Sequence, residues 1–513
     1  MKMTMLVKQP FGERAKMAGI ESIGHIPEPN LLFGRGGRCV DQRWGLYYFG
    51  PYWFSEQEMP HPSTISIGII GSGETVDLTR TILDRLRQGI NPPAGSSIPP
   101  FPGFSSDTQF RCGLEVNRGS IELFRRQELE MLKQKRGFGE RMAYALELIK
   151  GRLRNLSERE PRPDVTIVAM PPEIKALCAR GWNRFGKPLR KPRKAAGAPD
   201  AGSAQTVLGQ YVSVDEMKAQ LAEEAHYSSI YRATKVEAMQ FDMPTQVLQE
   251  GTLTGNGLED PCTVSWNLAV GLYYKAGGHL WRLANAAQGT CYVGVSFYQS
   301  WDDAVRSSMA QVFSHSGEGL VLKGGKADES LSTRSPHLDR IEAQRLLEEV
   351  LRTYKSQMGT LPTRVVVHKS SRYWDDEREG FMNALSDIEQ WDMVAIEKSD
   401  MRLFCFGSQP PVRGTYFTTG NDRTHLYARG YVPFRQTYWG PSTPLPITIL
   451  EHIGDTPRMA LCEEILGLTK MNWNTSAFSI DPPITLFFSK KVGALLSEAR
   501  ENTKHQSRYL YYM

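Results

Sequence analysis

The chain has 513 residues, of which 40% are hydrophobic and 23% are charged, and its formal net charge is +5. This length is too great for one compact core, so at least two domains are expected, and the composition excludes a long disordered protein. The mild positive charge permits nucleic-acid binding without requiring it. No apolar stretch is long enough to cross a bilayer, and charges interrupt the apolar run at the N-terminus, so neither a membrane span nor a signal peptide is expected.

The cysteines and histidines give no metal or disulfide pattern. The seven cysteines are odd in number, far apart and never in a C-x-x-C pair. This usage predicts reduced thiols in a cytoplasmic protein. The ten histidines show no metal-ligand spacing, so a metal site stays unknown. A Gly-Ser-Gly turn at 71–73 lacks the third glycine of a dinucleotide fingerprint, and no organic cofactor is predicted.

The first half of the chain alternates between strand and helix patterns. A β-branched run at 64–71 precedes an amphipathic helix, and a longer helical pattern covers 120–156. A second buried strand is predicted at 164–170, before two prolines. This alternation predicts an α/β layer with a largely parallel sheet.

Residues 180–205 are rich in Lys and Arg, with Trp182 and Phe185 among them. One interpretation is a solvated, mobile loop. The other is a patch that contacts a nucleic-acid backbone, because cations interleaved with aromatic rings suit that ligand. Four side chains in this segment are candidates for such contacts: Arg184, Lys187, Arg190 and Lys191.

The segment 231–281 predicts an anion pocket. A helix over 212–239, which Ser213 would cap, places Tyr231 and Lys235 on one face because they are four residues apart. A short strand then supplies Gln246, and a second helix supplies Lys275. Two ammonium groups, a phenol and an amide could together bind a terminal phosphate, such as the 5′ end of a nucleic acid. The alternative is that these side chains simply face solvent.

The second half of the chain predicts another α/β block. A helix over 338–357 separates two predicted strand pairs, and a final helix over 457–473 has Thr456 as its expected N-cap. This order is compatible with a ribonuclease-H-like fold. The four strands are predicted at 292–298, 319–323, 364–368 and 393–397.

A nuclease with this fold needs several carboxylates on the sheet to hold two Mg²⁺ ions. The first and third predicted strands contain no acid, and Lys369 would repel a metal. The acids at 375–377 begin a helix, where they favour its N-terminus, although they could also be displaced metal ligands. His368, at a strand end, is expected to be structural or to face a guide strand, and it and Lys369 are further candidates for contacts to a nucleic-acid backbone.

Several motifs in the chain together resemble those of one protein family. In order and spacing they are similar to a short prokaryotic Argonaute, which consists of MID and PIWI domains. The matching segments, in addition to the pocket residues, are 28–34, 45–51, 101–104, 273–281, 468–474 and 483–490.

This resemblance implies a Rossmann-like MID domain followed by a ribonuclease-H-like PIWI domain. It places an N-terminal segment leading into MID at 1–60, MID at 61–285 and PIWI at 286–513. The implied guide 5′-phosphate site consists of Tyr231, Lys235, Gln246 and Lys275.

The resemblance also implies a catalytically inactive PIWI domain. The acidic tetrad positions fall at Ser296, Ser370 and about Lys490, with Glu318 near the fourth, so two metal ions could not be held. Mg²⁺ at the guide 5′ phosphate is possible. A long tail leaves open whether the carboxylate of Met513 reaches the pocket.

The implied function is recognition of a complementary strand, single-stranded DNA, by a small guide RNA. Inactive relatives form one half of a two-protein defence system. The other half is an APAZ-domain subunit fused to a TIR, sirtuin-like or nuclease effector, commonly one that depletes NAD⁺ and so aborts infection. The alternative is a guided endonuclease that uses displaced acids such as Asp375 or Glu318.

Overall fold

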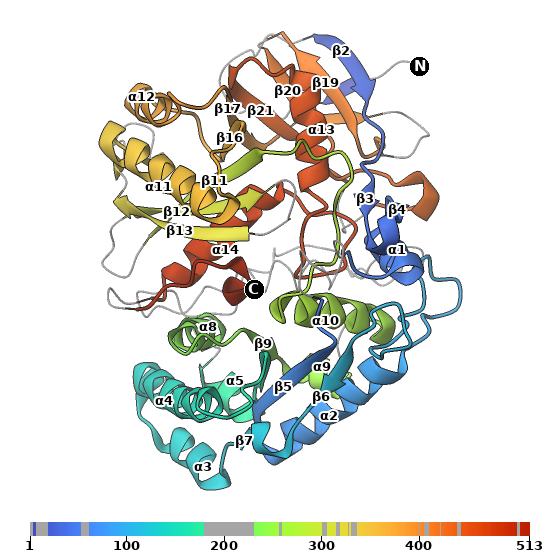
Figure 1. Cartoon of the computed structure of the whole chain (residues 1–513), viewed down its shortest axis with the longest axis vertical. Helices are drawn as coiled ribbons and strands as arrows, with labels where there is room; N and C mark the ends of the chain where they lie inside the picture. Colours follow the sequence, from blue (N-terminus) through green and yellow to red (C-terminus); the bar gives the residue numbers. More distant parts are fainter. Residues whose placement is uncertain are drawn as a thin grey trace, which may run out of the picture.

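The chain folds into two lobes, each built on its own β-sheet, as the computed structural model shows (Figure 1). None of the helices in the described parts of the chain is long and apolar enough to cross a membrane. The described residues are 4–6, 19–52, 61–178, 230–255, 259–299, 305–313, 319–326, 328–329, 336–399, 401–404, 410–420, 422–438, 443–499 and 503–513.

The lower lobe in Figure 1 has a parallel sheet with strand order β6-β5-β8-β9, and β7 also pairs with β5. Every residue of β8 is buried, as expected for a parallel strand covered on both faces. The predicted α/β layer with a parallel sheet is therefore confirmed. The strands are β5 (Thr64–Gly71), β6 (Gly113–Glu115), β7 (Ile121–Leu123), β8 (Val165–Ala169) and β9 (Thr245–Leu248).

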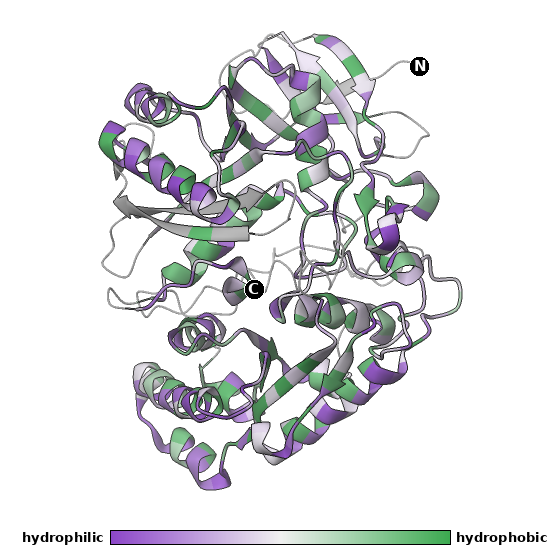
Figure 2. Cartoon of the chain, viewed as in Figure 1, coloured by the Kyte–Doolittle hydropathy of each residue, from purple (hydrophilic) through white to green (hydrophobic). Residues whose placement is uncertain are grey.

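Helices cover both faces of this sheet. The side chains of α2 and α10 pack with one hydrophobic cluster, and those of α3, α4, α5 and α8 pack with another. Figure 2 shows hydrophilic residues along the outer side of α2 and apolar residues in the strands. The helices are α2 (Gly73–Gln88), α3 (Arg126–Gln134), α4 (Gly137–Ser157), α5 (Pro172–Cys178), α8 (Ile230–Gln240), α9 (Glu250–Thr254) and α10 (Pro261–Lys275).

Two predicted helices of this lobe differ from the structure. The pattern over 120–156 is not one helix, because it begins with β7 and is interrupted between α3 and α4, where Gly137 has a φ of +80°. A positive φ is incompatible with a continuing right-handed helix. Of the helix predicted over 212–239, only the C-terminal part, α8, lies within the described residues, and Ser213 lies outside them.

The upper lobe contains a nine-stranded sheet with strand order β13-β12-β11-β16-β17-β21-β20-β19-β2. Neighbours are antiparallel except that β16 runs parallel to both β11 and β17. The parallel pairing of β11, β16 and β17 agrees with the predicted ribonuclease-H-like arrangement, but the predicted strands at 292–298 and 319–323 are not neighbours, because β12 lies between them. The strands are β2 (Ile20–His25), β11 (Thr290–Gln299), β12 (Val305–Phe313), β13 (Gly319–Lys326), β16 (Arg364–Lys369), β17 (Gln390–Lys398), β19 (Thr415–Thr419), β20 (Arg423–Leu426) and β21 (Ile447–Gly454).

Three helices enclose the central strands of this sheet. Helices α11 (Arg340–Met358) and α12 (Asp375–Ala384) pack with one hydrophobic cluster, and α14 (Ile484–Leu496) packs against β11 from the other side. The last predicted helix is shorter than expected: α13 (Arg458–Leu468) begins one residue after Pro457 and ends five residues before 473. Thr456 does not cap it; its hydroxyl donates to Asp392 at 2.7 Å. Strand β12 and helix α14 were not predicted.

The N-terminal segment contributes a strand to the sheet of the upper lobe. Strand β2 forms an edge of the nine-stranded sheet by pairing with β19. Further along, β3 (Leu31–Leu32) pairs with both β4 (Arg38–Cys39) and β10 (Arg282–Leu283), and α1 (Gln42–Phe49) follows. The remaining short elements are β1 (Thr4–Leu6), β14 (Asp328–Glu329), β15 (Pro336–His337), β18 (Arg402–Phe404), η1 (Gly34–Gly36), η2 (Arg118–Ser120), η3 (Pro433–Arg435) and η4 (Tyr509–Tyr512).

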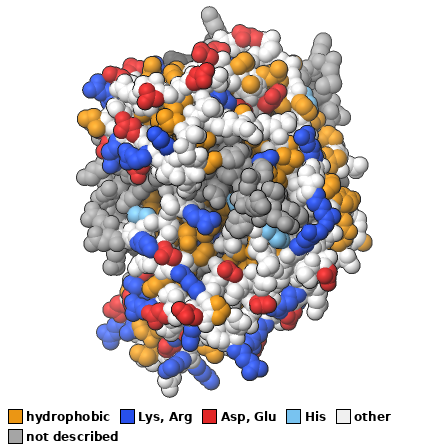
Figure 3. Space-filling model, viewed as in Figure 1, with side chains coloured by type: hydrophobic (Ala, Val, Ile, Leu, Met, Phe, Trp, Pro, Cys, Tyr) orange, Lys and Arg blue, Asp and Glu red, His pale blue; other side chains and the backbone are white. Residues whose placement is uncertain are grey.

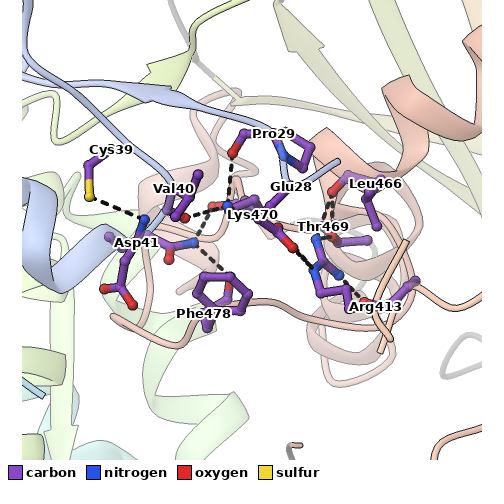
Figure 4. Close-up of polar contacts among 12 residues, drawn as sticks. Glu28, Pro29, Cys39, Val40, Asp41, Arg413, Leu466, Thr469, Lys470 and Phe478 are labelled. Atoms are coloured by element: carbon purple, nitrogen blue, oxygen red, sulfur yellow. Dashed lines mark hydrogen bonds and ion pairs between the residues drawn. The ribbon is translucent and has the colours of Figure 1, made fainter. Parts of the chain in front are cut away.

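A buried ionic cluster fastens this segment to the upper lobe (Figure 4). The Lys470 ammonium donates to Glu28 at 3.0 Å and to the carbonyls of Pro29 and Val40, and Arg413 donates to the same carboxylate at 3.0 Å. Burial lowers the pKa of Lys470 to about 8. Burial alone would raise the pKa of Glu28, but Arg413 and Lys470 hold it below its usual value. The residues 28–34, matched above as a family motif, thus have a structural role.

Candidate functional site

The structure brings three of the four predicted pocket residues, Lys235, Gln246 and Lys275, together where α8, β9 and α10 meet, whereas Tyr231 packs in the hydrophobic cluster of α3, α4 and α5. Lys275, the last residue of α10, donates to the side-chain oxygen of Gln246 on β9 at 2.5 Å. Lys235 on α8 donates to the carbonyl of Thr245, the residue before Gln246, at 3.3 Å. Tyr231 is buried and lies one helical turn before Lys235. Side chains from two helices and a strand therefore line one site.

The electrostatics of this site favour an anion. Lys275 is only 2% exposed. Burial, together with the positive charges of Lys235 and Lys491, holds the pKa of Lys275 well below its ordinary value. Clustered ammonium groups destabilise one another unless a negative ligand lies between them. The arrangement suits a phosphate, which accepts hydrogen bonds from several donors at once.

Sequence reasoning missed the contribution of Lys491. It singled out the preceding residue, Lys490, which is exposed on α14. Lys491 is half-buried on the same helix and lies over the ring of Phe487 at 4.9 Å. The only sequence signal for Lys491 was the pair of consecutive lysines at 490 and 491. Two neighbouring residues of a helix point in different directions, and which of them faces inward is known only once the packing of the helix is known.

The C-terminal residue completes one wall of the pocket. The main-chain oxygen of Met513 accepts a hydrogen bond from Lys235, and Gln506 donates to the carbonyl of Met239 on α8 at 2.8 Å. The long tail therefore does not keep Met513 from the site. The described residues contain no group of three His, Cys, Asp or Glu side chains suited to a metal.

The depressed pKa of Lys275 predicts proton uptake when the site binds a phosphate. A bound dianion favours the charged ammonium, so binding raises the pKa of Lys275 and weakens as the pH rises. Calorimetry at about pH 8, where a phosphate monoester (second pKa about 6) is already a dianion, should detect the uptake in buffers of different ionisation enthalpy. A 5′-phosphorylated oligonucleotide should show it, and a 5′-hydroxyl one should not. Equal uptake by Lys275→Met would contradict this assignment.

The expected positions of the catalytic acids lie on the face of the upper sheet that α14 covers. Gly294 pairs with His368 across β11 and β16, and a Cβ on Gly294 would meet the carbonyl oxygen of Thr485 on α14 at 2.2 Å. Ser296 lies two residues further on, so it is on the same face. Val295 pairs with Lys369, the last residue of β16, so Ser296 on β11 lies beside the strand end that Ser370 follows. Two of the positions at which the Argonaute resemblance expects carboxylates in a cleaving relative are therefore serines at neighbouring strand levels.

Two candidate nucleic-acid contacts are buried in the structure, which corrects the sequence-based expectation for them. His368 is 1% exposed, its Nδ1 lies 2.8 Å from the hydroxyl of Thr485, and burial together with Arg364 lowers its pKa to about 3. Lys369 is fully buried and forms an ion pair with Glu377. Neither side chain is available to a nucleic-acid backbone. The other four candidates, Arg184, Lys187, Arg190 and Lys191, lie outside the described residues.

The acids proposed as displaced metal ligands have other roles or lie outside the described residues. Glu377 accepts a hydrogen bond from the main-chain nitrogen of Trp374 at 3.3 Å, which caps α12, and it also pairs with Lys369. Asp375 is exposed and lies 3.7 Å from Arg378. The helix-capping interpretation is therefore confirmed for Glu377. Glu318 falls outside the described residues.

Comparison with known proteins shows similarity to Argonautes. No family model matches the chain. It is 23% identical to the Argonaute of Aquifex aeolicus over 313 residues, 60% of this chain and 40% of that protein. It is also 30% identical to the Argonaute of Thermus thermophilus over 131 residues, 25% of this chain and 18% of that protein.

Solved structures extend the similarity over almost the whole fold. The Argonaute of Clostridium butyricum, bound to a guide DNA and a 19-mer target DNA, has a TM-score of 0.61 at 15% identity, covering 94% of this chain and 54% of that one. The Argonaute of A. aeolicus has a TM-score of 0.54 at 16% identity and covers 98% and 56%. Drosophila Piwi has a TM-score of 0.54 at 12% identity and covers 95% and 56%.

The two lobes thus have the α/β architecture of Argonaute MID and PIWI domains. The sequence similarity, over part of the chain, is likewise to Argonautes. It spans about half the length of the solved structures and 40% or less of the curated relatives it matches.

Proposed function

We propose that this chain is a guide-dependent nucleic-acid recognition module. Its pocket binds the 5′ phosphate of a small guide RNA, and the guide pairs with a complementary strand, single-stranded DNA. The observation that carries this proposal is the meeting of Lys235, Gln246 and Lys275, with the charge of Lys491, in one buried site. The C. butyricum Argonaute with guide and target DNA supports it, since that protein shares the fold.

We propose further that this module does not cleave its target. In-line displacement at a phosphodiester requires carboxylates that hold two metal ions. Support comes from Ser296 on β11 and Ser370 just after β16, and from the engagement of Glu377 with Lys369. A guided endonuclease would need acids elsewhere on the sheet.

A cleavage assay tests this proposal. Purified protein, a 5′-phosphorylated guide RNA and a labelled complementary DNA are incubated with Mg²⁺ or Mn²⁺. We expect stable target binding and no product, and Ser296→Asp alone should also give none, because one carboxylate cannot place two metals. A guide-dependent product from the wild-type chain would contradict the proposal.

We also propose that target recognition activates a partner subunit. A module that binds without cutting leaves the response to another protein. The Argonaute resemblance favours a cytoplasmic heterodimer with an APAZ-domain effector, a TIR or sirtuin-like NADase, in defence against invading nucleic acid. Purification from the native operon, with identification of the associated subunit and sequencing of the bound nucleic acid, tests this. Recovery of the chain with guide RNA but without a second subunit would contradict it.

A further inference from the structure

Helix α1 presents aromatic rings to solvent. Tyr48 is 61% exposed, and its ring stacks on that of Trp44 with the centroids 5.5 Å apart and the planes at 20°. Tyr47 meets both rings edge-on, at 5.8 and 5.3 Å. Asp41 caps the helix, and the Trp44 indole donates to the carbonyl of Ser97 at 3.2 Å. The rings are therefore held in a fixed column whose outer face is open.

Exposed arginines lie in the turn that packs against the same helix. Arg35 and Arg38 are both exposed, and no ion pair to either is found among the residues that the structure describes. The turn packs closely against α1 at Gly37, which has no side chain. A Cβ at this position would lie 2.1 Å from the ring of Phe49 on α1, too close for any other residue. Arg35 has a φ of +56°, a backbone conformation that is uncommon for a residue other than glycine.

The charge of this surface has one sign. Arg38 and Arg282 both pair with Leu32, from its two neighbouring strands, so the two arginines lie on one face of the small sheet. The only acid between residues 31 and 52 is Asp41, which is 1% exposed and bound to Arg435. Figure 3 shows Lys and Arg side chains beside hydrophobic ones at the right-hand margin, at the height of α1 in Figure 1.

We propose that this surface binds single-stranded nucleic acid outside the 5′-phosphate pocket, with a base stacked on Tyr48 and phosphates at Arg35 and Arg38. Aromatic rings interleaved with cations fit unpaired bases and their backbone, because every base has a flat face and every nucleotide a negative charge. The surface is separate from the pocket, since Figure 1 shows α1 and α8 at opposite sides of the molecule. A strand that extends beyond the pocket would have a second place of attachment.

The test uses the full chain and a labelled 5′-hydroxyl oligodeoxythymidine, which lacks the phosphate that the pocket requires. Tyr48→Ala should weaken binding roughly five- to a hundredfold, the range for loss of one stacked base, whereas Tyr48→Phe should retain it. Arg35→Gln and Arg38→Gln should each reduce the slope of log K against log salt by about 0.7. Met131→Ala, at an exposed apolar side chain on α3, is the matched control and should change nothing.

A second readout locates the contact directly. With 5-iododeoxyuridine in the oligonucleotide, photo-crosslinked peptides should map to α1, and Tyr48→Ala should remove them. Unchanged affinity in Tyr48→Ala and no crosslink on α1 would overturn the proposal. So would concentration-dependent self-association that Tyr48→Ala abolishes without changing oligonucleotide affinity, since the surface would then be a protein interface. Tyr48→Ala should leave the preference for 5′-phosphorylated over 5′-hydroxyl guides unchanged, whereas Lys235→Met with Lys275→Met should abolish that preference, which separates this inference from the proposed function.

Discussion

Replacing both pocket lysines, as Lys235→Met with Lys275→Met, is expected to abolish the preference for 5′-phosphorylated over 5′-hydroxyl guides. Each ammonium–phosphate hydrogen bond contributes about 1.5–3 kcal/mol to binding. Losing two of them should therefore lower the affinity for the phosphorylated guide a hundredfold or more. Methionine keeps the length and most of the volume of lysine, which matters at Lys275 because that side chain is buried. Competition binding with matched guides that differ only at the 5′ end measures the effect.

The control for this prediction is Lys133→Met. Lys133 is on α3 in the same lobe, and its side chain is 46% exposed in an ion pair with Glu130. The Lys133→Met variant should keep the full preference for a guide with a 5′ phosphate. Thermal unfolding of both proteins shows whether the lobe remains folded. If the double variant still preferred the phosphorylated guide as strongly as the wild type, the pocket would not be the phosphate site.

Local periodicity was enough to predict most of the elements that form the site. The buried run of β5 and the spacing of Tyr231 and Lys235 are properties of neighbouring residues, and both are present in the structure. The convergence of Lys275 on Gln246 was a hypothesis that depended on how a strand and two helices pack, and the structure shows the contact.

The contacts that sequence reasoning missed join segments far apart in the chain. Lys491 and Met513 reach the pocket from the last part of the chain, and β2 joins the upper sheet by pairing with β19. No local pattern encodes such pairings, because they depend on which faces remain to be covered once the sheets form. The prediction that Lys369 contacts nucleic acid was wrong for the same reason. A lysine at the end of a strand usually reaches solvent, and its buried partner, Glu377, is evident only from the position of α12.

Lys369→Ala is expected to lower the free energy of unfolding by about 3–5 kcal/mol, the usual cost of removing one partner from a buried ion pair. Both side chains of the Lys369–Glu377 pair are fully buried, and the ammonium also lies 5.4 Å from the ring of Phe297 and 5.5 Å from that of Tyr373. Without the lysine, the Glu377 carboxylate keeps its desolvation cost and loses its counter-charge. Urea unfolding of the upper lobe, followed by near-ultraviolet circular dichroism, measures the loss.

A double variant distinguishes a structural lysine from one that binds nucleic acid. Lys369→Met with Glu377→Gln removes both charges but keeps a side-chain oxygen that can accept from the main-chain nitrogen of Trp374, so the double variant should be more stable than Lys369→Ala. Because neither side chain reaches the surface, guide and target affinities of this folded double variant should equal those of the wild type. A stable double variant that bound guide or target tenfold more weakly would instead show that Lys369 leaves its partner to contact the nucleic acid. The burial of the pair argues against that, since separating it would leave the Glu377 carboxylate buried without its counter-charge.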